Sequence, residues 1–483
     1  MPCPVFPKPA KSKSSLWKVF FKKRHSWLDA LYERSYRMKM GEFKLPGFRL
    51  YMVNQPDLVR KVMVQDIANF PKNRLLGEIL EPLLGESIFT TNGEQWQKQR
   101  DMLDPAFKHT RVQQVFSLMQ AAVNDMSARL TQHQPGQDID PEMTFITADI
   151  IFRTIMSTQL SQQQADKILA AFVRFQAESP KLALLKMFKA PRFMQRGASE
   201  RKRIKAAKEI RSAIEEIVTP RYNQAQAARQ GCPQSQALLA EQQDILSSLL
   251  QAIDADSQAP FSFNEVVDQI SMLFLAGHET TASSLTWSLY LLALYPEIQQ
   301  QAREEVQSIL AEQEMGVQAL RKMVLVRDTF REALRLYPPV GFLSRECSHA
   351  TQMRDKNMPA GSSVMISPWL IHRHEDFWDN PHGFDPGRFT RKDLKMPLSK
   401  SYLPFGAGPR VCIGAAFAQQ EASLILATIL KNYRFSLADG FVPEPVGKLT
   451  IRSQNGMRLV LTPITDAAVT QNNHTEAQTE TEK

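Results

Sequence analysis

The sequence predicts a mainly α protein with a small mixed β region. Helical spacing of apolar residues recurs over most of its 483 residues, whereas strand-like runs are short. The longest helical run opens on a capping-box pattern, Ser262-Phe263-Asn264-Glu265, and stops before Pro296. This run of about 32 residues would extend about 48 Å, and it is apolar almost all round. Such a helix is typically buried through the middle of a large domain.

The remaining elements are expected in the following order. The chain should begin with a helix at 27–34, a strand at 48–53, a helix from Pro56 to about Val64 and a loop-rich stretch at 70–93. Further helices are expected at 112–130, 141–158, 162–178, 196–228 and 415–431, with strands at 363–366 and in a terminal hairpin at 449–461. Residues 223–243 are rich in Gln and Ala, which favours an exposed linker.

The net charge of +9 is concentrated near the start of the sequence, because residues 1–40 contain ten Lys or Arg and two acids. The remainder is nearly neutral and has no aromatic-plus-basic motif, which argues against nucleic-acid binding. No run approaches the roughly 20 apolar residues that a transmembrane span needs. Residues 1–40 are therefore expected to be a solvated basic leader or a segment in weak contact with an anionic membrane surface, and an import signal stays open.

The cysteines and the last residues also bear on the class of protein. Four cysteines, none spaced as CxxC, are too few for a disulfide framework and suit a reducing compartment, so we expect a cytoplasmic protein. Residues 464–483 are polar and lack periodicity, which predicts a disordered tail.

A glycine-rich stretch at residues 405–414, hereafter the Cys loop, reads Phe-Gly-Ala-Gly-Pro-Arg-Val-Cys-Ile-Gly. Its glycines permit tight turns and a close approach of the backbone to a flat partner. Cys412 falls at the expected start of a helix, where free N–H groups stabilise a thiolate. A thiolate is a good ligand for a soft metal, and Arg410 could hold a carboxylate of the same cofactor. A buried, inert cysteine is the alternative.

One stretch of the long helix contains residues that are unfavourable in an apolar helix: Ala276-Gly277-His278-Glu279-Thr280-Thr281, hereafter the helix motif. A glycine within a helix costs about 1 kcal/mol relative to alanine, two β-branched residues follow, and Glu279 puts a carboxylate in an apolar helix. Such conflicts indicate function. Thr280 could instead bond to the carbonyl four residues back, and His278 is interpreted as structural.

The Cys loop resembles the haem-binding loop of the cytochrome P-450 family at every position of Phe-Gly-x-Gly-x-Arg-x-Cys-x-Gly, which includes Phe405 and Gly406. The helix motif is similar to the family's oxygen-activation motif, with Glu where some members have Asp. The resemblance implies one domain at 41–463, with haem b (iron protoporphyrin IX) buried between the long central helix and the Cys loop. It implies that Cys412 is the axial iron ligand.

The same resemblance assigns roles within the helix motif. Gly277 would leave room for O2 beside the cofactor, Thr280 would act on bound oxygen, and Glu279 would relay protons.

Three cationic or aromatic residues match positions that hold the haem propionates in the family. Trp96 and Arg100 are spaced i, i+4 on one helix face, and Arg345 matches a second propionate cation. A surface cation–π pair is the alternative for Trp96 and Arg100, and a surface arginine is the alternative for Arg345.

A scaffold triad is implied by two further elements. Glu332 and Arg335 are similar to the family's ExxR element, and Arg388 matches the arginine of its Pro-x-Arg-Phe segment, although Gly387 departs from the acid that some members carry. The triad would hold the Cys loop. An exposed i, i+3 bridge is the alternative for ExxR.

Apolar residues of the long helix and of the stretch after Pro339 indicate an apolar substrate pocket. The residues expected to line it are Phe274, Leu275, Ala276, Val340, Phe342 and Leu343.

The resemblance implies a haem-thiolate monooxygenase that hydroxylates or epoxidises a lipophilic substrate. With no reductase domain fused, electrons would come from a ferredoxin-type donor with its reductase, and we expect a monomer. A peroxide-driven peroxygenase and a non-catalytic haem-binding protein are the alternatives. Glu279 and Thr280 argue against the peroxygenase, because peroxide needs no oxygen-activation relay.

Overall fold

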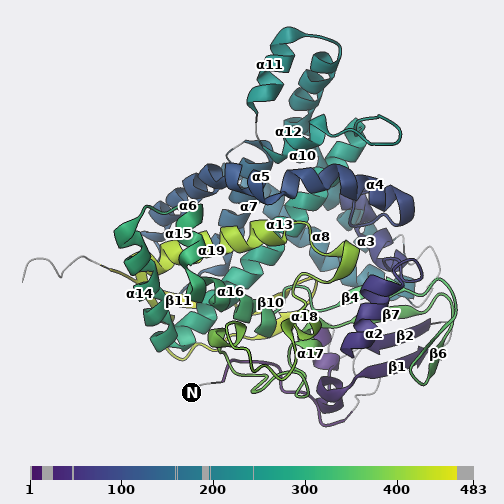
Figure 1. Cartoon of the computed structure of the whole chain (residues 1–483), viewed down its shortest axis with the longest axis vertical. Helices are drawn as coiled ribbons and strands as arrows, with labels where there is room; N and C mark the ends of the chain where they lie inside the picture. Colours follow the sequence, from purple (N-terminus) through teal and green to yellow (C-terminus); the bar gives the residue numbers. More distant parts are fainter. Residues whose placement is uncertain are drawn as a thin grey trace, which may run out of the picture.

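The computed structural model describes residues 3–12, 26–45, 48–157, 159, 161–187, 195, 197–242 and 244–464. The expectation of a mainly α fold with small sheets is confirmed (Figure 1). The α-helices are α2 (Pro56–Arg60), α3 (Arg74–Leu84), α4 (Gly93–Leu103), α5 (His109–Gln114), α6 (Phe116–Leu130), α7 (Asp140–Met156), α8 (Gln162–Met187), α10 (Ala198–Arg229), α11 (Pro233–Glu241), α12 (Ile245–Gln251), α13 (Phe263–Leu294), α14 (Pro296–Glu312), α15 (Val317–Lys322), α16 (Val324–Leu336), α17 (Pro368–Ile371), α18 (Leu398–Ser401) and α19 (Ala415–Asn432).

Short helical turns and strands complete the fold. The turns are η1 (Trp27–Ala30), η2 (Glu33–Arg37), η3 (Lys61–Gln65), η4 (Asp104–Phe107), η5 (Pro386–Phe389) and η6 (Gly408–Arg410). The strands are β1 (Met40–Leu45), β2 (Phe48–Val53), β3 (Gln137–Asp138), β4 (Leu343–Glu346), β5 (Thr351–Met353), β6 (Lys356–Met358), β7 (Ser363–Ile366), β8 (Tyr433–Leu437), β9 (Pro445–Gly447), β10 (Ile451–Ser453) and β11 (Arg458–Pro463).

Helix α13 is the central element, as its apolar composition predicts. The expected capping box forms, because the Ser262 N–H donates to Glu265 Oε2 at 2.8 Å and the Glu265 N–H donates to Ser262 Oγ at 3.3 Å. The helix packs most extensively on α7 and also contacts α10, α16 and α19. It therefore lies at the centre of the main hydrophobic core.

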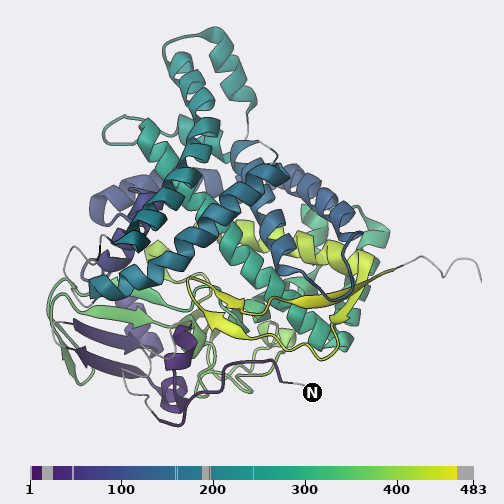
Figure 2. The same cartoon turned by 180° about the vertical axis from the view of Figure 1, so that it is seen from behind.

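The strands form small sheets at the edge of the helical body (Figure 1). The largest has the order β1-β2-β7-β4, in which β2 and β7 are parallel and the other neighbours are antiparallel. Strands β3, β11 and β8 form a second sheet, and β9 and β10 form a hairpin. Seen from behind, the C-terminal strands run beside the central helices (Figure 2).

The beginning of the chain is not the solvated leader that we expected. The Val5 N–H donates to the Tyr290 hydroxyl at 3.0 Å, and the Tyr337 hydroxyl donates to the Val5 carbonyl at 2.5 Å. The Phe6 ring stacks on His382 with centroids 4.2 Å apart. Residues 3–10 are therefore packed on the core, whereas the basic residues 13–25 and the expected tail at 465–483 lie outside the described residues.

Two other expectations need correction. The expected helix at 27–34 is divided into the short turns η1 and η2. The expected linker at 223–243 is instead helical, because α10 continues to Arg229 and α11 folds back against it. This helical hairpin projects from the body of the molecule (Figure 1). Among the described residues, no helix combines the length and apolar character needed to cross a membrane.

Candidate functional site

Helix α13 presents a strip of accessible surface in the middle of its buried length. Between Val266 and Leu292, all of which are described, only Ala276, Gly277 and Thr280 are not buried. These positions, i, i+1 and i+4, lie on one side of the helix. That side therefore faces a space that other side chains leave open.

Two residues of the helix motif make contacts that bear on their expected roles. The Thr280 hydroxyl donates to the Ala276 carbonyl at 2.7 Å, which is the alternative left open by the sequence. A Cβ on Gly277 would lie 2.4 Å from Ile151 Cδ1 of α7. A larger residue at this position would therefore force the Ile151 side chain to move.

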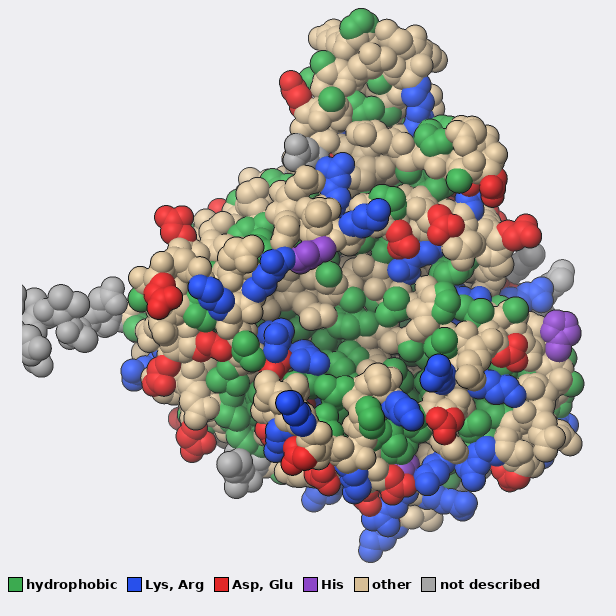
Figure 3. Space-filling model, in the orientation of Figure 1, with side chains coloured by type: hydrophobic (Ala, Val, Ile, Leu, Met, Phe, Trp, Pro, Cys, Tyr) green, Lys and Arg blue, Asp and Glu red, His purple; other side chains and the backbone are tan. Residues whose placement is uncertain are grey.

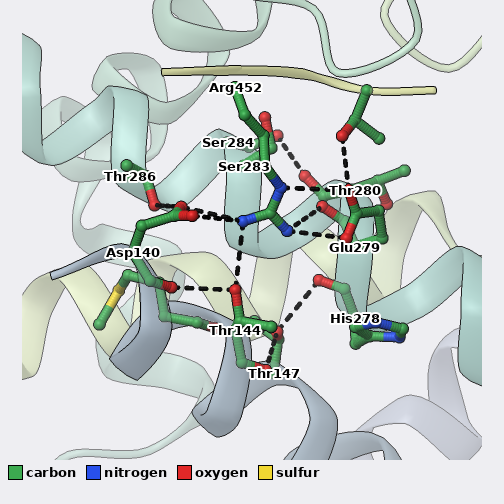
Figure 4. Close-up of polar contacts among 12 residues, drawn as sticks. Asp140, Thr144, Thr147, His278, Glu279, Thr280, Ser283, Ser284, Thr286 and Arg452 are labelled. Atoms are coloured by element: carbon green, nitrogen blue, oxygen red, sulfur yellow. Dashed lines mark hydrogen bonds and ion pairs between the residues drawn. The ribbon is translucent and has the colours of Figure 1, made fainter. Parts of the chain in front are cut away.

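Glu279 is held by residues that sequence reasoning missed. Its Oε2 pairs with Arg452 Nη2 at 2.8 Å (Figure 4). Its Oε1 accepts from the Thr450 hydroxyl at 2.6 Å. Burial alone would raise the pKa of Glu279, but the charge and hydrogen bonds of Arg452, with the help of His278 and Thr450, lower that pKa to about 2. Glu279 is therefore ionised at neutral pH.

His278 is structural in this arrangement, as the sequence interpretation held. Its Nδ1 lies 2.6 Å from the Phe274 carbonyl, and its ring stacks on the Phe274 ring at 4.5 Å. Burial lowers the pKa of His278, so the neutral imidazole is favoured.

The Cys loop adopts the tight turns that its glycines predict. Gly406 and Gly408 have φ of +79° and +71°, and the Cys412 N–H donates to the Phe405 carbonyl at 2.9 Å. Cys412 lies just before the helix N-cap, Gly414. Its depth in the protein raises the pKa of the Cys412 thiol, which the Gly414 amide and Arg100 partly offset. The side chain is nevertheless accessible, so it faces an open space rather than packed atoms.

A pair of glycine substitutions tests how closely the Cys loop approaches η3. Gly408 and Gly440 both have a left-handed φ, which costs alanine about 1–2 kcal/mol. A Cβ on Gly408 would lie 2.2 Å from the Met63 carbonyl oxygen, whereas nothing lies within 4 Å of one on Gly440. Gly408→Ala should therefore lower the free energy of unfolding, measured by chemical denaturation, clearly more than Gly440→Ala. Equal losses would show that the contact with Met63 is unimportant.

Four basic side chains, hereafter the cation cluster, lie in or beside the Cys loop: Lys72, Arg100, Arg345 and Arg410. The Arg410 guanidinium lies 5.5 Å from the centre of the buried Trp96 ring, and Arg410 Nη1 donates to the Phe70 carbonyl at 2.8 Å. Arg100 Nη1 donates to the Val411 carbonyl of the loop at 2.9 Å. Arg100 also pairs with Asp104.

The cation cluster has unused hydrogen-bond donors. The Nε atoms of Arg345 and Arg410 are buried without a hydrogen-bond partner. Burial lowers the pKa of Arg345 to about 10, and the charge of Arg410 contributes. Buried donors of this kind are normally satisfied, so the cluster has the chemistry to accept anionic groups.

Lys72 was missed because nothing in its local sequence marks it. Its Nζ donates to the Thr91 carbonyl at 2.8 Å and lies 5.4 Å from the centre of the Trp96 ring. Burial, together with the charges of the neighbouring arginines, lowers the pKa of Lys72 to about 6.

The shifted pKa of Lys72 predicts a pH-dependent stability. Above about pH 6 and below its ordinary pKa of 10.5, the unfolded chain holds a proton on Lys72 that the haem-free folded chain has released. The free energy of unfolding of the haem-free protein should therefore rise with pH through this window. Lys72→Met should remove this contribution in denaturation measured at several pH values, whereas Lys98→Met, at a side chain that is 40% exposed, should not. An unchanged slope in Lys72→Met would contradict the prediction.

The structure brings Glu332, Arg335 and Arg388 together. Arg335 Nε and Nη2 each donate to a Glu332 carboxylate oxygen at 2.8 Å, and Arg388 Nε donates to Glu332 Oε1 at 2.9 Å. The three side chains are 0–2% exposed, so the alternative of an exposed i, i+3 bridge is wrong.

His372 joins this buried group to the chain that leads into the Cys loop. Its carbonyl accepts from Arg335 Nη1 at 2.8 Å, and its Nε2 accepts from the Leu403 N–H at 2.8 Å. Burial and the charges of nearby arginines lower the pKa of His372 to about 3, which keeps the accepting nitrogen free of a proton.

The expected pocket residues divide into two groups. Phe274 is 2% exposed, and its ring packs on Phe152 of α7 at 5.2 Å, so its assignment to the pocket lining is corrected to core packing. Leu275 is also buried, at 7%. Ala276, Val340, Phe342 and Leu343 keep accessible surface, although the Phe342 ring packs on Trp27.

The residues present fit a haem with a thiolate ligand. The accessible Cys412 sulfur matches the iron. The unused donors of the cation cluster match the propionates, and the accessible strip on α13 matches the flat ring. The face in Figure 3 shows a central area of hydrophobic side chains with lysine and arginine side chains around it.

Comparisons with known proteins agree with this fit. Residues 9–459 match the family model described as cytochrome P450. The chain is 28% identical to a cytokinin hydroxylase of Arabidopsis thaliana over 85% of this chain and 78% of the relative. It is 28% identical to a cyclooctatin synthase of Streptomyces melanosporofaciens, over 88% and 87%, and 27% identical to an 11-oxo-beta-amyrin 30-oxidase of Medicago truncatula, over 85% and 78%. Because the family match extends over nearly the whole sequence, this chain belongs to the cytochrome P450 family.

Proposed function

We propose that this cytochrome P450 monooxygenase takes electrons from a separate ferredoxin-type donor and hydroxylates or epoxidises a lipophilic substrate, with Cys412 as the ligand of its haem iron. Haem b held by a cysteine thiolate is the general cofactor of the family. The observation that carries the assignment is the accessible Cys412 sulfur in a loop whose own backbone bonds hold it in place.

The cation cluster is proposed to bind the two propionates. Arg345 and Arg410 each have an unused Nε donor, and Arg100 lies beside the Cys loop. Trp96 lies under Arg410 and Lys72 and completes the apolar side of this site. Charge-assisted hydrogen bonds to the carboxylates would offset the free-energy cost of burying these charged side chains.

The accessible strip of α13 is proposed to face the reacting side of the cofactor. Bound haem supplies the redox chemistry that activates O2. Ala276 has only a methyl side chain and leaves room there. The Thr280 hydroxyl beside it donates to the Ala276 carbonyl, and its oxygen can accept a further hydrogen bond. Glu279 is proposed to accept and pass on protons, because it is ionised while it pairs with Arg452.

The pocket lining is proposed to consist of Ala276, Val340, Phe342 and Leu343. These residues are apolar and partly accessible, which favours a lipophilic substrate.

The donor is proposed to bind where the Cys loop reaches the surface. Val411, next to Cys412, is 37% exposed, and its carbonyl is held by Arg100. An acidic iron–sulfur protein would bring its cluster close to the thiolate at this place, attracted by basic residues near the loop. All four cysteines are free, which supports a cytoplasmic location.

Reconstitution tests the proposal. The purified haem protein, mixed with a ferredoxin, its reductase and NADPH, should oxidise at least one compound of a lipophilic panel chosen by spectral shift. Products should contain one oxygen from labelled O2. Products formed with peroxide but never with the donor system would favour the peroxygenase, and no product with either would favour a non-catalytic haem protein.

A further inference from the structure

Arg452 connects two carboxylates that belong to different parts of the fold. Its Nη2 pairs with Glu279 of α13 at 2.8 Å, and its Nη1 donates to both carboxylate oxygens of Asp140, at 2.9 and 2.8 Å. Asp140 is the first residue of α7, and Arg452 is the central residue of β10 (Figure 4). We call this arrangement the Glu279–Arg452–Asp140 bridge.

The two ends of the bridge differ in how they are supported. The Asp140 carboxylate also accepts from the Thr286 hydroxyl at 2.8 Å, and Arg452 Nη1 donates to Thr144 at 3.1 Å. The Glu279 end has the Thr450 hydroxyl, which comes from the same hairpin as Arg452. The Asp140 end can therefore keep Arg452 paired when Glu279 changes its partner.

The acid and the alcohol of the helix motif engage different partners in this state. The Thr280 hydroxyl donates to the Ala276 carbonyl, whereas the Glu279 carboxylate points toward Arg452 (Figure 4). The charged groups around Glu279 are Arg452 and, behind it, Asp140. The adjacent His278 is titratable, but burial lowers its pKa and favours the neutral imidazole. Arg452 is thus the group that compensates the buried charge of Glu279.

We propose that Arg452 is a positioning residue that keeps Glu279 ionised and turned away from Thr280. Asp140 is the fixed anchor of Arg452: it holds the guanidinium in place when Glu279 is released. This inference deepens the proposed function and, in its catalytic meaning, rests on it. A released Glu279 would be a buried carboxylate without a counter-charge, and it would therefore take up a proton. The bridge thus controls when Glu279 is protonated.

The pairing can be tested directly in the purified haem protein by infrared titration from about pH 4 to about pH 9, without substrate or donor. Arg452→Gln should produce a protonated-carboxyl band that is absent from the unmodified protein at neutral pH. The double variant Arg452→Gln with Glu279→Gln should lack that band, which assigns it to Glu279. Arg452→Lys should restore the ionised form in part.

Asp140→Asn is the matched control, because it also breaks an ion pair of Arg452 but leaves Glu279 with its cation. It should lower the melting temperature as Arg452→Gln does, yet give no new carboxyl band. A band common to both variants, or no band in Arg452→Gln, would overturn the proposal.

A functional readout separates this inference from the proposed function. In donor-driven turnover of a panel compound, product formed per NADPH should become pH-dependent in Arg452→Gln. In Asp140→Asn, where Glu279 keeps its counter-charge but Arg452 loses its anchor, it should fall without becoming pH-dependent. The same pH profile in both variants would mean that Arg452 has only a structural role. If the proposed function were wrong, the unmodified protein would form no product. The infrared result does not depend on turnover and would still test the pairing of Glu279 with Arg452.

Discussion

Replacing Cys412 by alanine is expected to abolish the thiolate-type Soret band of the reduced, CO-bound protein. Alanine has no electron pair for iron, and a soft thiolate is what gives this band its position. The fold should survive, because the Cys412 N–H keeps its bond to Phe405 and the side chain is accessible rather than packed. Difference spectroscopy after dithionite and CO measures the band, and circular dichroism measures the fold.

The matched control is Cys232→Ala. Cys232 is also a free and partly accessible cysteine, but it lies at the start of α11 in the projecting hairpin. Its replacement should leave the Soret band unchanged. If Cys412→Ala kept the band, or if Cys232→Ala removed it, the assignment of the ligand would be wrong.

Replacing Glu332 by glutamine should be the most destabilising of the substitutions considered. It leaves Arg335 and Arg388, both at most 2% exposed, without their shared carboxylate. Breaking a buried ion group of this kind costs about 3–5 kcal/mol of unfolding free energy. Chemical denaturation of the haem protein measures the loss, and we expect the thiolate-type Soret band to disappear at lower denaturant than in the unmodified protein.

An exposed ion pair provides the comparison for Glu332. Arg37 and Glu375 pair at 2.9 Å with side chains that are 72% and 48% exposed. Glu375→Gln should cost at most about 1 kcal/mol, because solvent screens such pairs. Similar losses in the two variants would show that burial of the triad contributes nothing.

The long central helix and the Cys loop could be predicted because their signals are local. A capping box, an unbroken apolar run and glycines at fixed spacing act within a few residues of one another. The positive φ of Gly406 and Gly408 likewise follows from the local sequence, because glycine adopts such angles readily. Sequence reasoning therefore identified the motif residues and where they lie along the chain.

The residues that contact these motif residues could not be predicted, because the contacts depend on tertiary packing. Arg452 is 173 positions from Glu279 along the chain, and no local pattern links the two. Phe274 lies one residue before the buried Leu275 in an apolar run, and only the packing of α7 decides that its ring faces the core. The same limit explains why Lys72 and the docked residues 3–10 were not anticipated.

The packing of Val5 against Tyr337 has a consequence for how the chain folds as it is synthesised. The two residues are 332 positions apart, so at about 5–20 residues per second the ribosome needs roughly 15 to 65 s to supply the partner after Val5 has been made. Val5 therefore leaves the ribosome long before its partner exists and can take its place only after Tyr337 has been made.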